Sequence, residues 1–140
     1  FAVNGSSLEL KVEGSGDIKV ADIDVEELEA IVAGSGELFI KNVQGEYGEF
    51  LVTGSGDLNI TEGSFMREIE VSVIGSGDVR ASKLDCEVAE VNVLGSGSIR
   101  LGEIRELLEA SIIGSGDVFY HGDPEVEAMQ LGSGGLRRRD

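Results

Sequence analysis

The sequence is poor in the residue types that most often carry chemistry. Its 140 residues include one cysteine, one histidine and one proline, no tryptophan, and only 5% aromatic residues. Because Cys86 is alone, no intramolecular disulfide can form, and because His121 is alone, a repeated serine–histidine pair is impossible. No run of 18 apolar residues is present, so we expect no membrane insertion by this segment.

Basic residues are also scarce, since 11 lysines and arginines stand against 27 aspartates and glutamates, a formal net charge of −16. Duplex nucleic acid and anionic membrane surfaces are both recognised through basic residues, so neither is an expected partner. Cations, basic proteins and neutral glycans stay open as partners. The sequence begins at Phe1 with no visible signal peptide, and we interpret it as a mature or trimmed domain.

Glycine, in contrast, is abundant, and most of it recurs at a regular spacing. The tripeptide Gly-Ser-Gly occurs seven times, at residues 14–16, 34–36, 54–56, 75–77, 95–97, 114–116 and 132–134. The triplets start 20, 20, 21, 20, 19 and 18 residues apart. A period of this length indicates one structural unit that is copied and stacked, as in a solenoid.

Each copy alternates apolar and polar residues on both sides of its triplet. Two residues before the triplet the sequence has Val12, Val32, Val52, Val73, Val93, Ile112 and Gln130. Period-two alternation indicates a strand with one buried face, and it outweighs the helix-forming residues at 25–30 and 104–109. One coil cannot bury its own apolar face, so the coils must stack in parallel. The sequence therefore predicts an all-β, single-domain, right-handed parallel β-helix of six to seven coils.

We divide the domain, residues 1–140, into a first strand or cap (1–13), the repeated coils (14–131) and a last turn with a basic tail (132–140). A variable corner absorbs the differences in coil length. The apolar residues expected to point inward at this corner are Ile23, Val43, Phe65, Leu84 and Ile104. Cys86 is expected to be buried near the same corner, as a small apolar residue.

One phrase, apolar-x-apolar-x-Gly-Ser-Gly-Asp-apolar, stands at residues 10–18, 50–58, 71–79 and 110–118. Repeated in this way along nearly the whole chain, it resembles the head GIN domain family, whose members are described as putative auto-transporter adhesins. The resemblance implies a β-helical domain of an exported or envelope protein of bacteria. It brings no established activity and no catalytic residue.

A glutamate stands five residues before every triplet. The positions expected to be buried stand an even number of residues before the triplet, so strand alternation places the glutamate on the outer face. The seven residues are Glu9, Glu29, Glu49, Glu70, Glu90, Glu109 and Glu127. Stacked coils bring these carboxylates about 4.8 Å apart, where like charges in water repel by about 1 kcal/mol per pair. One interpretation is a linear site for a metal ion such as Ca²⁺, or for a basic partner. The other is a solvated face that prevents sideways aggregation.

Two further columns belong to the turns. The position after each triplet holds Asp17, Glu37, Asp57, Asp78, Ser98, Asp117 and Gly135. We interpret this column as turn chemistry, in which a short side chain accepts hydrogen bonds from backbone N–H groups. The triplet serines are predicted to form a structural ladder, because only Ser115 has a histidine nearby in sequence, His121, and no third catalytic member is evident.

Large apolar residues occupy the position just before the later triplets. Ile74, Leu94, Ile113 and Leu131 stand there, where the earlier copies have Glu13, Ala33 and Thr53. Parity places these side chains outside, and an exposed apolar row indicates an interface for self-association or for a neighbouring domain. The alternative is that strand parity slips beside the turn, so that the row packs inward.

Together these features predict a non-enzymatic, structural or adhesin-like domain of an exported or cell-surface bacterial protein. Such a domain would present a rigid acidic face to a protein or glycan partner. One alternative is a self-assembling solenoid that stacks end to end or laterally, and another is a cation-binding module that uses the glutamates. No cofactor is expected except Ca²⁺ in that last case. The short corners provide no loop to build a cleft, which argues against an enzyme.

Overall fold

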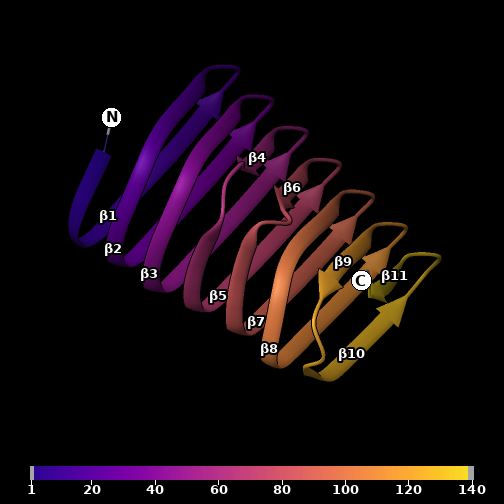
Figure 1. The fold of residues 1–140 in the computed structure, drawn as a ribbon. Helices are drawn as coiled ribbons and strands as arrows, with labels where there is room; N and C mark the ends of the chain where they lie inside the picture. Colours follow the sequence, from indigo (N-terminus) through magenta and orange to yellow (C-terminus); the bar gives the residue numbers. More distant parts are fainter. Residues whose placement is uncertain (1, 139–140) are drawn as a thin grey trace.

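The structure of the chain, a computed structural model, describes residues 2–138, and every regular element in that range is a β-strand (Figure 1). The strands are β1 (Ala2–Gly14), β2 (Asp17–Gly34), β3 (Glu37–Gly54), β4 (Asp57–Ile60), β5 (Ser64–Gly75), β6 (Asp78–Ala81), β7 (Leu84–Gly95), β8 (Ser98–Gly114), β9 (Asp117–His121), β10 (Glu125–Leu131) and β11 (Gly135–Arg138). The segments 25–30 and 104–109 lie inside β2 and β8, so alternation prevailed over helix propensity there.

Every strand pair is parallel, and it joins residues 18 to 21 positions apart. The chain therefore winds into a β-solenoid of about seven turns, which confirms the predicted fold class. Figure 1 shows two layers joined by the triplet turns along one edge and by the corners along the other. The long face consists of residues 22–34, 42–54, 64–75, 84–95, 102–114 and 125–131 with β1, and the short face consists of 17–20, 37–40, 57–60, 78–81, 98–101, 117–121 and 135–138.

The core lies between the two faces and is built from columns of equivalent side chains. Val32, Val52 and Val93 of the long face are at most 1% exposed, and so are Leu38, Leu58 and Ile99 of the short face. Parallel in-register pairing places each of them on its counterpart in the next coil. Each inner coil therefore buries its apolar face against two neighbours and the opposite layer.

The triplets form tight turns because their two glycines meet different constraints. The first glycine of each triplet has a positive φ, from +80° at Gly14 to +123° at Gly95, a conformation that side chains disfavour. The third glycine lies against the coil before it, so a Cβ at Gly97 would overlap the carbonyl oxygen of Gly77. Glycine is thus required once for conformation and once for close stacking.

One predicted corner residue was wrong. Ile23, Val43, Leu84 and Ile104 are buried as expected, but Phe65 points outward, and Ser64 (5% exposed) occupies the inward position. The Ser64 hydroxyl accepts a hydrogen bond from the Val43 N–H at 2.9 Å and donates to the Glu62 carbonyl at 3.1 Å. The extra residue of this 21-residue coil lies before Ser64, which shifts Phe65 by one position and hence to the other face.

Cys86 is fully buried, as predicted, and lies in register between Met66 and Ile104. Burial raises the pKa of its thiol to about 12, and the nearby Asp85 acts in the same direction. The thiol is therefore un-ionised at neutral pH and unreactive as a nucleophile. No helix long and apolar enough to cross a membrane occurs between residues 2 and 138.

Candidate functional site

The predicted glutamates form one continuous ladder on the outside of the long face, which we call the Glu column. Pairing brings Glu9 beside Glu29, and the series continues without a gap through Glu49, Glu70, Glu90, Glu109 and Glu127. All seven side chains are exposed or half-buried. Among residues 5–138, no lysine or arginine forms an ion pair with any of them.

The middle of the Glu column is where the carboxylates interact most strongly. Burial raises the pKa of Glu49, and the neighbouring carboxylates of Glu70 and Glu29 raise it further. The Tyr47 hydroxyl donates a hydrogen bond to Oε2 of Glu70 at 3.1 Å. Burial, followed by this hydrogen bond to Glu70, raises the pKa of Tyr47 to about 12, so the phenol stays protonated and serves as a donor.

Replacing Glu49 with glutamine is expected to stabilise the fold at pH 7 by about 0.5 kcal/mol, because a carboxylate is removed from between two others. The folded protein binds this proton more tightly than the unfolded chain does, so stability falls as pH rises through the mildly acidic range. The gain of the E49Q variant over wild type should shrink as pH falls toward 4.5. Thermal unfolding at a series of pH values measures both effects.

Glu13 provides the matched control for this substitution. Its pKa is lowered, mainly by a hydrogen bond from Lys11, whose Nζ lies 2.9 Å from its Oε1. Glu13→Gln should therefore not stabilise the protein at pH 7, whereas Glu49→Gln should. Equal responses of the two variants would contradict a repulsive ladder centred on Glu49.

The Glu column does not converge on a point. Within residues 2–138, no group of three or more histidine, cysteine, aspartate or glutamate side chains is arranged to hold a metal ion. A flat row offers each cation two neighbouring carboxylates, fewer oxygens than Ca²⁺ usually takes. A calcium site on the seven glutamates therefore stays a prediction, without a coordination geometry to support it.

The apolar row predicted before the later triplets lies on the outer surface, which excludes inward packing by a slip of parity. Ile74 is 47% exposed, Leu94 51%, Ile113 39% and Leu131 58%. The four side chains are consecutive in the strand register, and we call them the apolar column. Their role as an interface stays a prediction.

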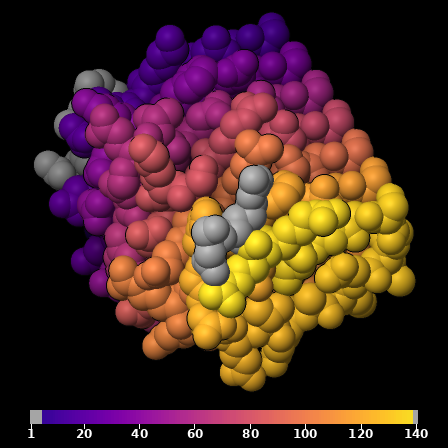
Figure 2. All heavy atoms as spheres, turned by 45° about the vertical axis from the view of Figure 1, so that its right-hand side comes forward, coloured from indigo at the N-terminus to yellow at the C-terminus, as the bar shows by residue number. Residues whose placement is uncertain are grey.

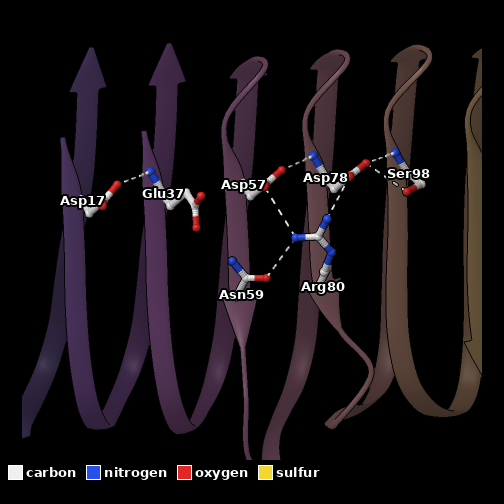
Figure 3. A network of polar contacts seen from close by, with 7 residues as sticks. All are labelled: Asp17, Glu37, Asp57, Asn59, Asp78, Arg80 and Ser98. Atoms are coloured by element: carbon white, nitrogen blue, oxygen red, sulfur yellow. Dashed lines mark hydrogen bonds and ion pairs between the residues drawn. The ribbon is translucent and has the colours of Figure 1, made fainter. Parts of the chain in front are cut away.

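The acidic residues after the triplets link neighbouring coils on the short face (Figure 3). Oδ1 of Asp57 accepts a hydrogen bond from the Asp78 N–H at 3.2 Å, and Oδ1 of Asp78 accepts one from the Ser98 N–H at 3.1 Å. Asp17 and Asp117 bond in the same way to the N–H groups of Glu37 and Gly135. The backbone hydrogen bonds predicted from sequence are therefore present at the four aspartates, but they join one coil to the next rather than closing the turn of their own coil.

Sequence reasoning missed a column of cations and aromatic rings two residues further along the short face. In register, this column contains Lys19, Phe39, Asn59, Arg80, Arg100, Phe119 and Arg137. Arg80 donates to the carboxylates of Asp57 and Asp78 at 3.4 and 3.3 Å (Figure 3). Lys19 lies 5.5 Å from the centre of the Phe39 ring. These contacts leave the short face electrostatically mixed. On the long face, Lys11 interacts with the charges of Glu9 and Glu29 but forms its ion pair with Glu13.

These features define a class of protein, a parallel β-solenoid domain whose outer faces carry columns of like side chains. More particularly, the chain belongs to the family described as putative auto-transporter adhesin, head GIN domain, whose profile matches residues 2–124. The resemblance noted from the repeated phrase is therefore confirmed. No curated protein sequence gives a significant match.

Three solved structures from Parabacteroides share the fold over almost the whole chain. A putative adhesin from P. merdae ATCC 43184 has a TM-score of 0.95 at 21% identity, covering 99% of this chain and 57% of its own. A putative adhesin from P. distasonis ATCC 8503 has a TM-score of 0.90 at 21% identity, covering 99% of this chain and 58% of its own. A putative lipid binding protein from the same P. distasonis strain has a TM-score of 0.90 at 28% identity, covering 98% of this chain and 56% of its own. The chain thus spans less than three-fifths of each of these proteins.

Proposed function

We propose that this domain is a non-enzymatic, adhesin-like module of an exported bacterial protein, which presents the Glu column to a basic partner surface. The observation that supports this proposal most directly is the in-register row of seven carboxylates with no ion pair from residues 5–138. Unpaired carboxylates at a regular spacing attract basic groups without first losing an internal salt bridge. The family and its structural neighbours favour an adhesin-like rather than an enzymatic role.

Surfaces coated with polylysine test the proposal, with polyglutamate-coated surfaces as the blank. The variant Glu9→Gln/Glu29→Gln/Glu49→Gln removes three charges from the Glu column. Its control is Asp22→Asn/Asp24→Asn/Glu26→Gln, which removes three exposed charges from the corner of β2. We expect retention on polylysine to fall much more for the first variant than for the second. Equal losses would show that net charge alone binds the surface, and would overturn the proposal.

The structural neighbour described as a lipid binding protein adds a second probe. A lipid surface recognised through the Glu column would have to be cationic or zwitterionic, because a net charge of −16 repels anionic headgroups. Vesicles of zwitterionic lipid should therefore be compared with the polylysine surface under the same salt conditions. Binding to vesicles that is insensitive to the three glutamine substitutions would assign a lipid role to another face.

A second candidate is end-to-end self-association of residues 1–140, favoured by the open edge of β10 in this part of the protein. All seven residues of β10 are exposed, including the core positions Val126 and Ala128. Figure 2 shows this C-terminal end of the solenoid in yellow at the surface. Among the described residues, β10 is hydrogen-bonded to β8 on one side only, and such an edge can accept a further parallel strand. Sedimentation velocity of residues 1–140 over a range of concentrations tests this, and Val126→Lys should abolish any association that uses the edge.

A further inference from the structure

A groove runs along the outside of the long face across β5, β7 and β8. Its floor is the outward position between the Glu and apolar columns, occupied here by Ser72, Asn92 and Ser111, which are neighbours in register. One wall is formed by Glu70, Glu90 and Glu109, and the other by Ile74, Leu94 and Ile113. A hollow of about 260 Å³ lies over this floor on the apolar side, and a hollow of about 320 Å³ lies on the acidic side over β7, β8 and β10, with Glu127 and Met129 in its lining.

The groove ends toward β3 at a larger side chain in the floor position, and toward β10 the side chain in this position lines the acidic hollow. Leu51 occupies this position beside Ser72, and Met129 occupies it beside Ser111. In the earlier coils the sizes are reversed, because Ile31 and Leu51 are large while Ala33 and Thr53 stand at the wall position. The exchange of large and small residues between the two positions ends the groove at β3, so it lies over β5, β7 and β8 and its acidic side reaches β10.

The groove offers three kinds of unused interaction. None of the floor side chains forms a hydrogen bond with another group in the described part of the chain, although all three are half-buried. The carboxylates of Glu90 and Glu109 have no ion pair there either. Leu94 and Ile113 remain 51% and 39% exposed. A ligand that matches the groove therefore needs a basic side, an apolar side and polar groups between them.

We propose that this groove binds a basic amphipathic helix of a partner protein, lying parallel to the solenoid axis. The proposal rests on the function proposed above and specifies the partner's chemistry. The two walls are four residues apart along each strand, about 13 Å, which matches the diameter of about 10–12 Å of a helix with its side chains. Lysines on one side of such a helix would meet the glutamates, and leucines on the other would cover the apolar wall.

A second copy of this chain fits the groove poorly. The acidic wall would require a basic stripe beside an apolar one, whereas on the short face Arg80 and Arg137 already pair with aspartates and Arg100 lies over the Phe119 ring. Two grooves facing each other would also bring two acidic walls together in a chain of net charge −16. Charge complementarity therefore selects a basic partner over self-association at this site.

The test uses a leucine–lysine peptide of about 12 residues, which as a helix is basic on one side and apolar on the other and spans about 18 Å. A scrambled peptide of the same composition has the same charge but no apolar side. Fluorescence anisotropy at about 150 mM NaCl measures both affinities. We expect the amphipathic peptide to bind at least about tenfold more tightly than the scrambled one, because only the amphipathic helix can cover an exposed leucine side chain of the apolar wall.

The decisive variant is Asn92→Leu/Ser111→Leu, which fills the floor with the residue type that Leu51 already places at this position. It should weaken binding of the amphipathic peptide about tenfold. Asn59→Leu, an equivalent change on the short face, should leave binding unchanged. Circular dichroism and melting temperature confirm that each variant is folded.

Two results would overturn the proposal that this groove binds an amphipathic helix. The filled variant could bind the amphipathic peptide as well as wild type does, or wild type could bind the amphipathic and scrambled peptides equally. Either result would leave the proposed acidic face intact if polylysine retention still depends on the Glu column. Loss of that dependence, with peptide binding still sensitive to the filled floor, would instead overturn the acidic face as the general binding surface.

Discussion

Replacing Phe50 with alanine is expected to lower the free energy of unfolding by about 4 kcal/mol. The ring is 1% exposed and occupies space that its own coil leaves empty at Gly48. A Cβ at Gly48 would lie 2.8 Å from Cε2 of Phe50 and 2.6 Å from Sδ of Met66. Phe50 and Gly48 are therefore a matched pair. Chemical denaturation should show that Phe50→Ala and Gly48→Leu each cause a large loss of unfolding free energy.

The double variant Gly48→Leu/Phe50→Ala should recover most of that loss. It recreates the combination of Leu28 and Ala30, which lie directly beside Gly48 and Phe50 in the register. We expect a favourable coupling of about 3 kcal/mol between the two substitutions. Phe39→Ala is the control, because this ring is only half-buried and loses chiefly its contact with Lys19, so its cost should stay below about 1 kcal/mol. Additive losses in the double variant would contradict the proposed exchange of volume within the coil.

Replacing Gly97 with alanine should destabilise the protein by about 3 kcal/mol or more and lower its melting temperature by roughly 10 °C. The new Cβ would overlap the carbonyl oxygen of Gly77 and lie 2.6 Å from Cγ1 of Val73. The carbonyl belongs to the stacked backbone, so it cannot move away without disturbing the pairing of two coils. Thermal unfolding measures the effect directly.

Gly16 is the internal control for this substitution. It holds the same place in the first triplet, but no atom lies within 4 Å of the position its Cβ would take. Gly16→Ala should therefore cost little, even though Gly16 and Gly97 are both the third residue of a Gly-Ser-Gly triplet. If the two variants lose equal stability, the third glycine serves the turn itself rather than the stacking of coils.

The coil architecture could be predicted because the repeat reports each buried position several times. A single Val-x-Gly-Ser-Gly segment would be ambiguous, but Val12, Val32 and Val93 all stand two residues before a triplet and are all buried. The columns on the outer faces followed from the same parity. The Glu and apolar columns therefore lie where the sequence predicts, on the surface of the long face.

The corner at Phe65 could not be predicted, because a 21-residue step does not reveal which residue is looped out. The hydrogen bonds of the Ser64 hydroxyl decide it, and they depend on three-dimensional proximity to Val43. The groove was missed for a different reason. The groove depends on the side-chain sizes at two outward positions, and these sizes must be compared across several coils, such as Leu51 and Thr53 in one coil with Asn92 and Leu94 in another. The alternation of inward and outward positions does not include side-chain size.

The register of 18 to 21 residues between paired strands also determines how the chain can fold. Every strand meets a partner that is only one coil away in sequence, so no pairing requires distant parts of the chain to find each other. A mean separation of about one-seventh of the length gives a relative contact order of about 0.14, a value typical of mixed α/β domains rather than slower all-β barrels. Any two adjacent coils can therefore nucleate folding, and further coils add one at a time in both directions.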